Sequence, residues 1–139
     1  MSDITVKRID EMATTPTGFI LARASLGVSS FGMQVANFPP GFTDYPEHKH
    51  ESMTGEMAAI ANHGQEEVYI PLEGSGTLIA DGEEIALEPG MMVRCGPSQM
   101  RKIVTTDSPL KVLAVGAIPG KKYTAPAFTE IGTEATVGV

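Results

Sequence analysis

Glycine and proline interrupt this chain so often that long helices have little room to form. Fifteen glycines and ten prolines are spread over 139 residues, and the pieces between them are short and rich in β-branched or alternating apolar residues. Such pieces are typical of strands. In chain order they are ITVKRI, GFILARASL, SFGMQVANF, EEVYIPLEG, GTLIADG, EEIALEPG, MMVRCG, RKIVTT and LKVLAVGAI. We therefore predict an all-β protein.

The spacing of these pieces favours antiparallel strands. Many short strands without long helices between them are typical of sandwiches and barrels, and not of parallel α/β sheets. The clearest turn is Asp81-Gly82, which separates TLIA from EEIAL and predicts a two-residue hairpin. We expect a closed or two-sheet antiparallel β architecture.

Residues 51–64, ESMTGEMAAIANHG, differ in kind from the rest. Met53, Met57 and Ile60 recur at helical spacing among several alanines, and Gly64 is a suitable C-cap. The segment is nevertheless too short to be helical without tertiary support. We expect either a short helical flap or a surface loop here.

Size and charge narrow the function classes. A chain of 139 residues fits one domain. Its net charge of -7, without a basic cluster, argues against a nucleic-acid partner.

No apolar run approaches the roughly 18 residues of a membrane span, and the charged start is unlike a signal peptide, so we expect a cytoplasmic protein. Cys95 is the single cysteine and is expected to be a buried apolar residue.

Two of the three histidines stand one residue apart, in the stretch PEHKH. On a strand, residues i and i+2 point to the same face, so the rings of His48 and His50 are able to meet one ion. Glu67, at the start of the strand EVYIPLEG, adds a carboxylate. Such a mixed shell of imidazoles and a carboxylate suits zinc, iron, manganese or nickel.

At this point the sequence resembles the cupin family, whose motifs are G-x5-H-x-H-x3,4-E-x6-G and G-x5-P-x-G-x2-H-x3-N. HKH matches the paired histidines, and Glu67 through VYIPLE to Gly74 matches the E-x6-G half. The stretch GSGTLIADGEEIALEPG resembles the hairpin between the motifs, and Gly90 matches the first glycine of the second motif. The likeness covers about residues 31–115.

The resemblance implies a cupin-type antiparallel β-barrel, also called a double-stranded β-helix or jelly roll. We expect a single cupin domain over residues 1–139, with a core at about 31–118, an insertion at 51–64 and a C-terminal tail at 119–139. The family resemblance also implies a homodimer, for which the terminal segments ITVKRI and AFTEIG are available.

Two departures from the family pattern matter for function. Sixteen residues, 51–66, separate His50 from Glu67 where the family has three or four, so the flap is an insertion at the rim of the expected pocket. In the second motif, Arg101 stands at the histidine position, and the fourth metal ligand is missing. A guanidinium has no lone pair and cannot coordinate a cation, although it suits an anionic group.

Two interpretations of the pocket follow. In the first, His48, His50 and Glu67 bind Fe, Mn, Ni or Zn, and Arg101 holds a small anionic substrate of a metal-dependent oxygenase or isomerase. In the second, no metal is bound, Glu67 pairs with Arg101, and the histidines bind an organic ligand in a binding or sensing module without catalysis. A barrel filled by its own side chains is a third possibility.

Three further residues complete the expected ligand site. Tyr69 shares the inward strand face with Glu67. His63, Gln65 or Glu66 is available as a replacement for the missing ligand, and His63 is also placed to fold over the pocket as part of a lid. Glu66 is expected to point the opposite way from Glu67, into solvent. We thus expect a small-molecule-binding protein, and the sequence leaves open whether it is an enzyme.

Overall fold

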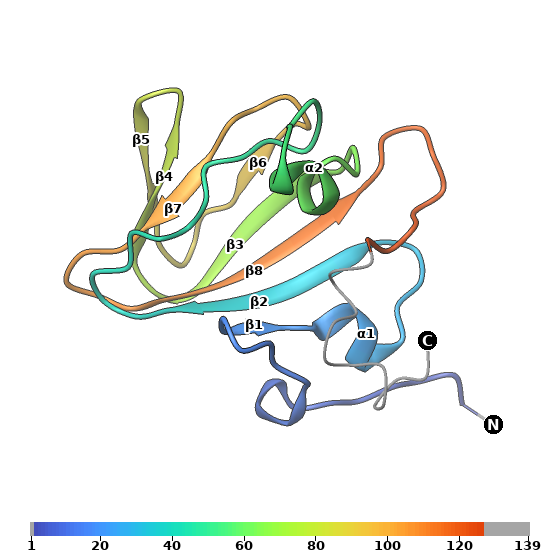
Figure 1. Ribbon diagram of the computed structural model, residues 1–139. Coiled ribbons are helices and arrows are strands. Elements are labelled where there is room, and N and C mark those ends of the chain that lie inside the picture. The colour runs from blue at the N-terminus through green and yellow to red at the C-terminus, as the bar shows by residue number, and fades with distance from the viewer. Residues whose placement is uncertain (1, 127–139) are drawn as a thin grey trace.

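The computed structural model describes residues 2–126, which form two antiparallel β-sheets with two short helices (Figure 1). One 3-10 turn, η1, spans Ile9–Glu11, and the helices are α1 (Ala22–Leu26) and α2 (Glu56–Ala61). The strands are β1 (Phe19–Ile20), β2 (Gly32–Phe38), β3 (Glu66–Gly74), β4 (Gly76–Ala80), β5 (Glu83–Leu87), β6 (Val93–Cys95), β7 (Lys102–Val104) and β8 (Leu110–Ala117). The all-β prediction is confirmed.

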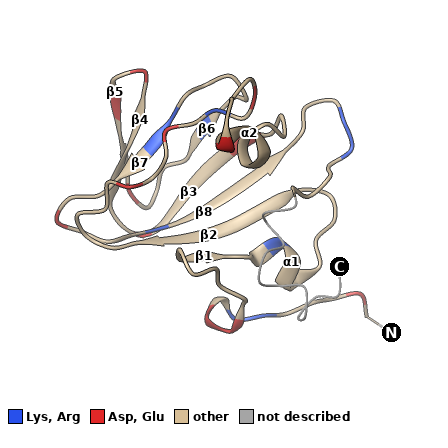
Figure 2. Ribbon diagram, in the orientation of Figure 1, with Lys and Arg blue, Asp and Glu red and all other residues tan. Residues whose placement is uncertain are grey.

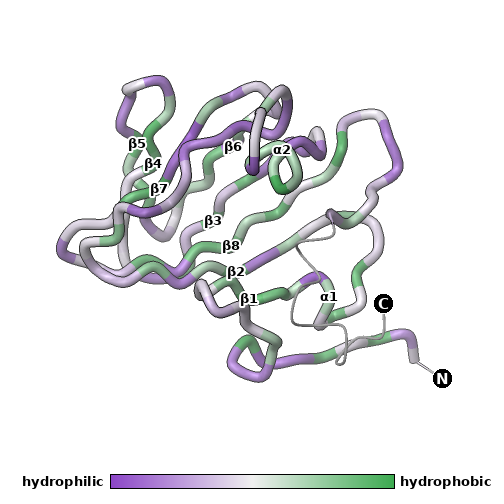
Figure 3. The backbone as a smooth tube through the Cα atoms, viewed as in Figure 1, coloured by the Kyte–Doolittle hydropathy of each residue, from purple (hydrophilic) through white to green (hydrophobic). Residues whose placement is uncertain are grey.

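The larger sheet has the strand order β1-β2-β8-β3-β6, and the smaller has β5-β4-β7. Both sheets contribute to one core, in which the smaller sheet packs its apolar face on the larger. The buried members of this core are Ala36, Phe38, Tyr69, Leu78, Leu87, Cys95, Ile103, Leu110 and Val112. Figure 3 shows hydrophobic segments along the strands and hydrophilic ones mainly in the connecting loops. The arrangement agrees with the antiparallel jelly roll expected from the sequence.

Most predicted strands are confirmed, but the first two are not. ITVKRI forms no strand in the described chain, and Ile4 and Val6 are 74% and 83% exposed. In GFILARASL only the first residues are extended, and ARASL is helix α1. This helix ends at Gly27, whose φ of 78° permits a left-handed cap with hydrogen bonds back to Arg23 and Ala24. The helix propensity of the alanines and the glycine cap therefore favour a helix here, although the apolar pattern predicted a strand.

The hairpin at Asp81-Gly82 is confirmed. Asp81 and Gly82 have φ values of 51° and 80°, as a type I′ turn requires, and Ala80 pairs with Glu83 across it. The predicted C-terminal pairing segment AFTEIG lies outside the described residues.

The inserted segment does contain a helix, α2, which ends at Asn62 instead of the expected Gly64. The Asn62 side chain explains the stop, since it binds the Met53 backbone twice: it accepts from the N–H at 2.9 Å and donates to the C=O at 2.8 Å. These two bonds close the insertion into a compact flap over the end of the larger sheet (Figure 1).

Figure 2 shows Lys, Arg, Asp and Glu scattered over loops, strands and helices. No helix in residues 2–126 is long and apolar enough to cross a membrane.

Glycine at position 74 is required by close packing where β3 ends. Gly74 has a φ of 75°, and a Cβ there would lie 1.9 Å from the carbonyl oxygen of Pro109. Gly82 has a similar φ of 80° but no atom within 4 Å of its Cβ position. We therefore predict that Gly74→Ala lowers the free energy of unfolding by about 3–5 kcal/mol and Gly82→Ala by about 1–2 kcal/mol, measured by urea denaturation. Equal losses would contradict this role of Pro109.

Candidate functional site

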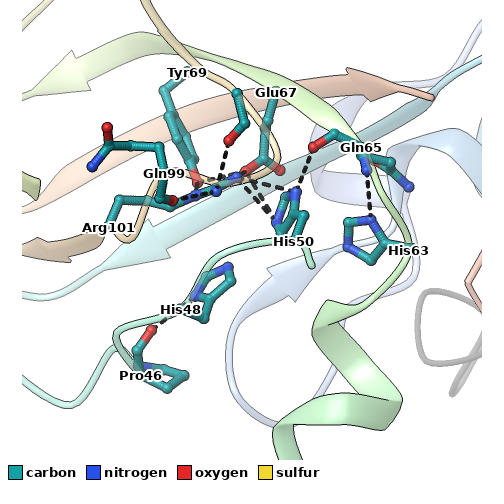
Figure 4. A network of polar contacts seen from close by, with 10 residues as sticks. Pro46, His48, His50, His63, Gln65, Glu67, Tyr69, Gln99 and Arg101 are labelled. Carbon is teal, nitrogen blue, oxygen red and sulfur yellow. Dashed lines mark hydrogen bonds and ion pairs between the residues drawn. The ribbon is translucent and has the colours of Figure 1, made fainter. Parts of the chain in front are cut away.

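The site lies where β3 passes the segment that carries the paired histidines. His48 and Arg101 form an isolated antiparallel bridge, in which each backbone N–H donates to the other residue's carbonyl, at 3.0 and 2.9 Å. This bridge brings the histidine segment beside the start of β7. Glu67 and Tyr69, alternate residues of β3, face the same interior space (Figure 4).

Arg101 is the centre of the site and is fully buried, at 0% exposure. Its Nε donates to the Tyr69 hydroxyl at 3.2 Å. Nη2 lies 2.9 Å from Glu67 Oε1 and 3.1 Å from both Nδ1 and Nε2 of His50. Nη1 donates to the carbonyls of Gln99 at 2.9 Å and Gly96 at 3.4 Å. All five N–H groups of the guanidinium therefore have acceptors within the protein.

Glu67 and Tyr69 complete the neutralisation of this buried charge. The Tyr69 hydroxyl donates to Glu67 Oε1 at 2.5 Å. Burial, together with the nearby carboxylate of Glu67, raises the pKa of Tyr69 well above its usual value, so the phenol stays protonated. The contacts with Tyr69 and Glu67 outweigh the opposing effect of burial and raise the pKa of Arg101. Arg101 and Glu67 thus form an ion pair at the inner end of the site.

His50 is held as a neutral ring in one tautomer. Its Nδ1–H donates to the Gln65 carbonyl at 2.9 Å, and Nη2 of Arg101 lies 3.1 Å from both ring nitrogens. The side chain is 4% exposed. Burial lowers the pKa of His50 to about 3, and the positive charge of Arg101 contributes to the shift. His50 is consequently uncharged at neutral pH.

His63 and His48 lie on either side of His50. The His63 ring is 4.1 Å from that of His50, and its Nδ1 accepts from the Gln65 N–H at 3.2 Å. Burial lowers the pKa of His63 to about 4. The His48 ring stacks 5.3 Å from that of His50, and its Nδ1–H donates to the Pro46 carbonyl at 2.9 Å. Burial also lowers the pKa of His48. Three imidazoles from the insertion and its flank therefore form a neutral cluster.

A cavity of about 370 Å³ opens beside this cluster. Its polar wall contains every ligand-site residue expected from the sequence except Arg101 and Tyr69, which lie behind it. Its apolar walls come from α1, α2 and β2, among other segments, and include Leu21, Ala24, Met33, Met57, Ile60 and Ala61. The insertion therefore covers the cavity with one face of α2. Mostly apolar walls with a few convergent polar groups are the usual composition of a small-molecule site.

Sequence reasoning missed several residues of this cavity. Gln34, Tyr45, Arg23 and Tyr123 also line it. Alternation along β2 places Gln34 on the inward face with the core residue Ala36, and that signal was available in the sequence. Arg23 and Tyr123 had no such signal, because α1 and the chain after β8 reach the cavity only through tertiary packing.

The residues present do not fit the metal ion that the family resemblance implies. His50 Nε2 and Glu67 Oε1 are 3.7 Å apart, and Nη2 of Arg101 stands within hydrogen-bonding distance of both. A cation between these two atoms would meet the guanidinium, which repels it. Within residues 2–126, no group of three or more His, Cys, Asp or Glu side chains has the arrangement of a metal site.

The geometry also gives Arg101 a different task from the expected one. A fully buried guanidinium whose N–H groups are already used by the protein has none to offer an anionic substrate. Glu66, by contrast, points outward as expected and pairs with Arg94 at 2.7 Å on the surface.

Comparison with known proteins agrees with this fold. Residues 51–116 match the family model of the cupin domain. A cupin protein from Bacteroides fragilis is 23% identical, with a TM-score of 0.64 over 91% of this chain and 96% of its own. A sugar phosphate isomerase of the cupin superfamily from Silicibacter pomeroyi is 20% identical, with a TM-score of 0.54 over 76% and 68% of the two chains.

The cupin domain of an XRE family transcriptional regulator from Enterobacter cloacae is 17% identical, with a TM-score of 0.51 over 67% of this chain and 86% of that one. A search among curated proteins gave no match. At these identities the likeness establishes the fold alone.

The depressed histidine pKa values predict how stability depends on pH. Because the pKa values of His50 and His63 lie at about 3 and 4, below the usual 6.5, the unfolded chain binds protons that the folded chain does not. Stability is then complete above pH 6.5 and falls as the pH drops from 6.5 toward 4. We expect a slope of at most about 1.4 kcal/mol per pH unit for each ring.

Urea denaturation between pH 7 and 5 measures this slope, and His63→Asn should make it shallower. Ring 15N spectra should show His50 and His63 neutral at pH 5.5, with the protons on Nδ1 and Nε2 respectively. A titration midpoint near 6.5 for both rings would refute the neutral cluster.

Two adjacent glutamates offer a matched test of the buried ion pair. Glu67 contacts a guanidinium of 0% exposure, whereas the side chains of Glu66 and its partner Arg94 are 42% and 64% exposed. We predict that Glu67→Gln costs about 2–4 kcal/mol, because it leaves Arg101 buried without a counter-charge. Glu66→Gln should cost no more than about 0.5 kcal/mol. Chemical denaturation distinguishes the two, and similar losses would mean that Arg101 does not depend on Glu67.

Proposed function

We infer the function from the site, because residues 51–116 match the model of the cupin domain and that fold hosts many unrelated activities. We propose that the protein binds a small, largely apolar organic molecule in the cavity beneath α2. The observation that carries the proposal is the composition of that cavity: about 370 Å³ of space with apolar walls and one polar end.

The histidine end of the cavity favours an uncharged group on the ligand, whereas the Arg23 guanidinium, which also lines the cavity, is a cation. Arg101 and Glu67 cancel each other's charge at 2.9 Å, and the neighbouring imidazoles are neutral. Neutral imidazoles whose Nδ1–H is already bound to a backbone carbonyl, as in His48 and His50, keep a lone pair on Nε2. The His50 ring is already in contact with Nη2 of Arg101, at 3.1 Å from both ring nitrogens, so His48 is the acceptor best suited to a ligand. A hydroxyl or N–H group on an otherwise apolar body fits these partners.

This binding role requires neither a metal ion nor a reaction. The metal-dependent oxygenase or isomerase expected from the family motif needs His48, His50 and Glu67 to share an ion, and needs a cation to hold an anionic substrate. The hydrogen bonds of Arg101 oppose both requirements, since they engage Glu67 and His50 and use all of its donors. Likeness to an isomerase and to a regulator domain at low identity does not choose between catalysis and sensing.

A pair of tryptophan variants tests the cavity. Met57 of α2 lines it, whereas Met92 is 70% exposed and does not. We predict that 2-naphthol, an apolar molecule with one hydroxyl, binds the wild-type protein, and that Met57→Trp weakens this binding at least about tenfold by filling the space. Met92→Trp should leave the affinity unchanged. Isothermal calorimetry or NMR titration provides the dissociation constants.

The matched anion 2-naphthoate tests the ligand chemistry separately. Tighter binding of the anion than of 2-naphthol would contradict the preference for an uncharged ligand, while leaving the cavity itself as the binding site. Equal binding of 2-naphthol by wild type and Met57→Trp would contradict the cavity.

A further inference from the structure

We propose that Gln34 and Glu67 together recognise an uncharged cyclic amide, a lactam, at the inner end of the cavity. The carbonyl of the lactam accepts a hydrogen bond from the Gln34 carboxamide, and its N–H donates to Oε2 of Glu67. This assignment rests on the proposed function, names the chemical class of ligand for the same cavity, and makes Gln34 a specificity-determining residue.

The large cavity adjoins a second, smaller one of about 30 Å³. The residues that line both are Phe19, Gln34, Tyr45, Glu67 and Ala114. These residues form a neck between the two spaces. A space as small as the inner one holds about one water-sized group, such as a carbonyl oxygen, and not a second ring. The polar part of a ligand is therefore expected at the neck, with its apolar body in the large cavity.

The sheet register places Gln34 and Glu67 on opposite sides of β8. Gln34 of β2 pairs with Ala114 of β8, which pairs with Tyr69 of β3 (Figure 1). Paired residues share one face of a sheet, and Glu67 shares that face with Tyr69. Here β8 contributes only Ala114 and Gly116, so none of its side chains is large enough to separate Gln34 from Glu67.

The distance across this gap suits an amide. Adjacent strands are about 4.7–4.9 Å apart, so β2 and β3, with β8 between them, are about 9–10 Å apart. A planar amide with a hydrogen bond of about 2.9 Å on each side spans most of that distance. The side chains of Gln34 and Glu67 cover the remainder.

Both side chains keep hydrogen-bonding groups for a ligand. Glu67 uses Oε1 in its contacts with Tyr69 and Arg101, and no hydrogen bond or ion pair within residues 2–126 uses Oε2. The Gln34 side chain likewise makes no hydrogen bond to the described part of the chain. Because Gln34 and Glu67 are only half-buried and line the cavity, these groups are accessible from it.

The chemistry of the two groups selects the ligand. A carboxylate oxygen only accepts hydrogen bonds, so Oε2 requires a donor, whereas the carboxamide N–H groups of Gln34 donate to a carbonyl. A lactam presents N–H and C=O side by side on one rigid edge. A cationic donor is less suitable, because the Arg101 guanidinium already neutralises Glu67 at 2.9 Å and would repel it.

The experiment compares 2-quinolone, a bicyclic lactam with the shape of 2-naphthol, with coumarin, in which a ring oxygen replaces the N–H. Isothermal calorimetry on the full-length wild-type chain provides the dissociation constants. We expect 2-quinolone to bind at least about tenfold more tightly than coumarin, because coumarin offers Oε2 of Glu67 no donor.

A matched pair of variants tests Gln34. Gln34→Leu should weaken 2-quinolone binding at least about fivefold, because the carbonyl of the ligand loses its donor. Asn37→Leu removes an exposed amide from the same strand and should leave the affinity unchanged.

Wild type that binds coumarin as tightly as 2-quinolone, or binds 2-naphthol but not 2-quinolone, would overturn the lactam assignment. Equal 2-quinolone affinity of wild type and Gln34→Leu would overturn the role of Gln34. In these cases the proposed function still stands if Met57→Trp weakens 2-naphthol binding, and it fails separately if Met57→Trp does not. The comparison of 2-quinolone with coumarin needs no variant, so it decides even if Gln34→Leu does not fold.

Discussion

A positive charge buried at 0% exposure is the constraint on which the rest of this structure depends. Removing a guanidinium from water is unfavourable by several kcal/mol unless every donor is satisfied and a counter-charge is close. Arg101 meets this requirement with one carboxylate, one phenol, one imidazole and two backbone carbonyls. These partners come from β3, from the histidine segment and from the loop before β7, so satisfying one side chain fixes three distant parts of the chain.

The hydrogen bonds around Arg101 and the apolar cavity beside them are formed by the same segments of the chain. With Glu67 engaged by Arg101 and Tyr69, the polar end has no net charge, and burial keeps the adjoining histidines neutral. The insertion contributes to both parts, because it supplies His63 beside His50 and the apolar face of α2 over the cavity. A departure from the family spacing thus forms one wall of the site.

Much of the fold was predictable because its signals are local. Alternation along EEVYIPLEG places Glu67 and Tyr69 inside and Glu66 outside, and the structure has them there. Turn chemistry likewise locates the hairpin at Asp81-Gly82. Prediction was wrong for GFILARASL, where a short helix with a glycine cap replaces most of the strand, and for ITVKRI, where no neighbouring strand provides hydrogen bonds. A short apolar run does not by itself show whether it forms a strand or a helix, because that depends on whether a neighbouring strand is available to pair with it.

The sequence by itself determined most of the antiparallel strands, the hairpin at Asp81-Gly82 and the inward face of β3, because side-chain alternation and turn preferences act over a few neighbouring residues. It left open whether Arg101 would turn toward a substrate or toward Glu67. Only the tertiary structure decided this, through a bridge between His48 and Arg101 that joins positions far apart in the chain. That pairing places the guanidinium 2.9 Å from Glu67. Because the guanidinium is buried there, it needs a counter-charge, and the ion pair with Glu67 provides it.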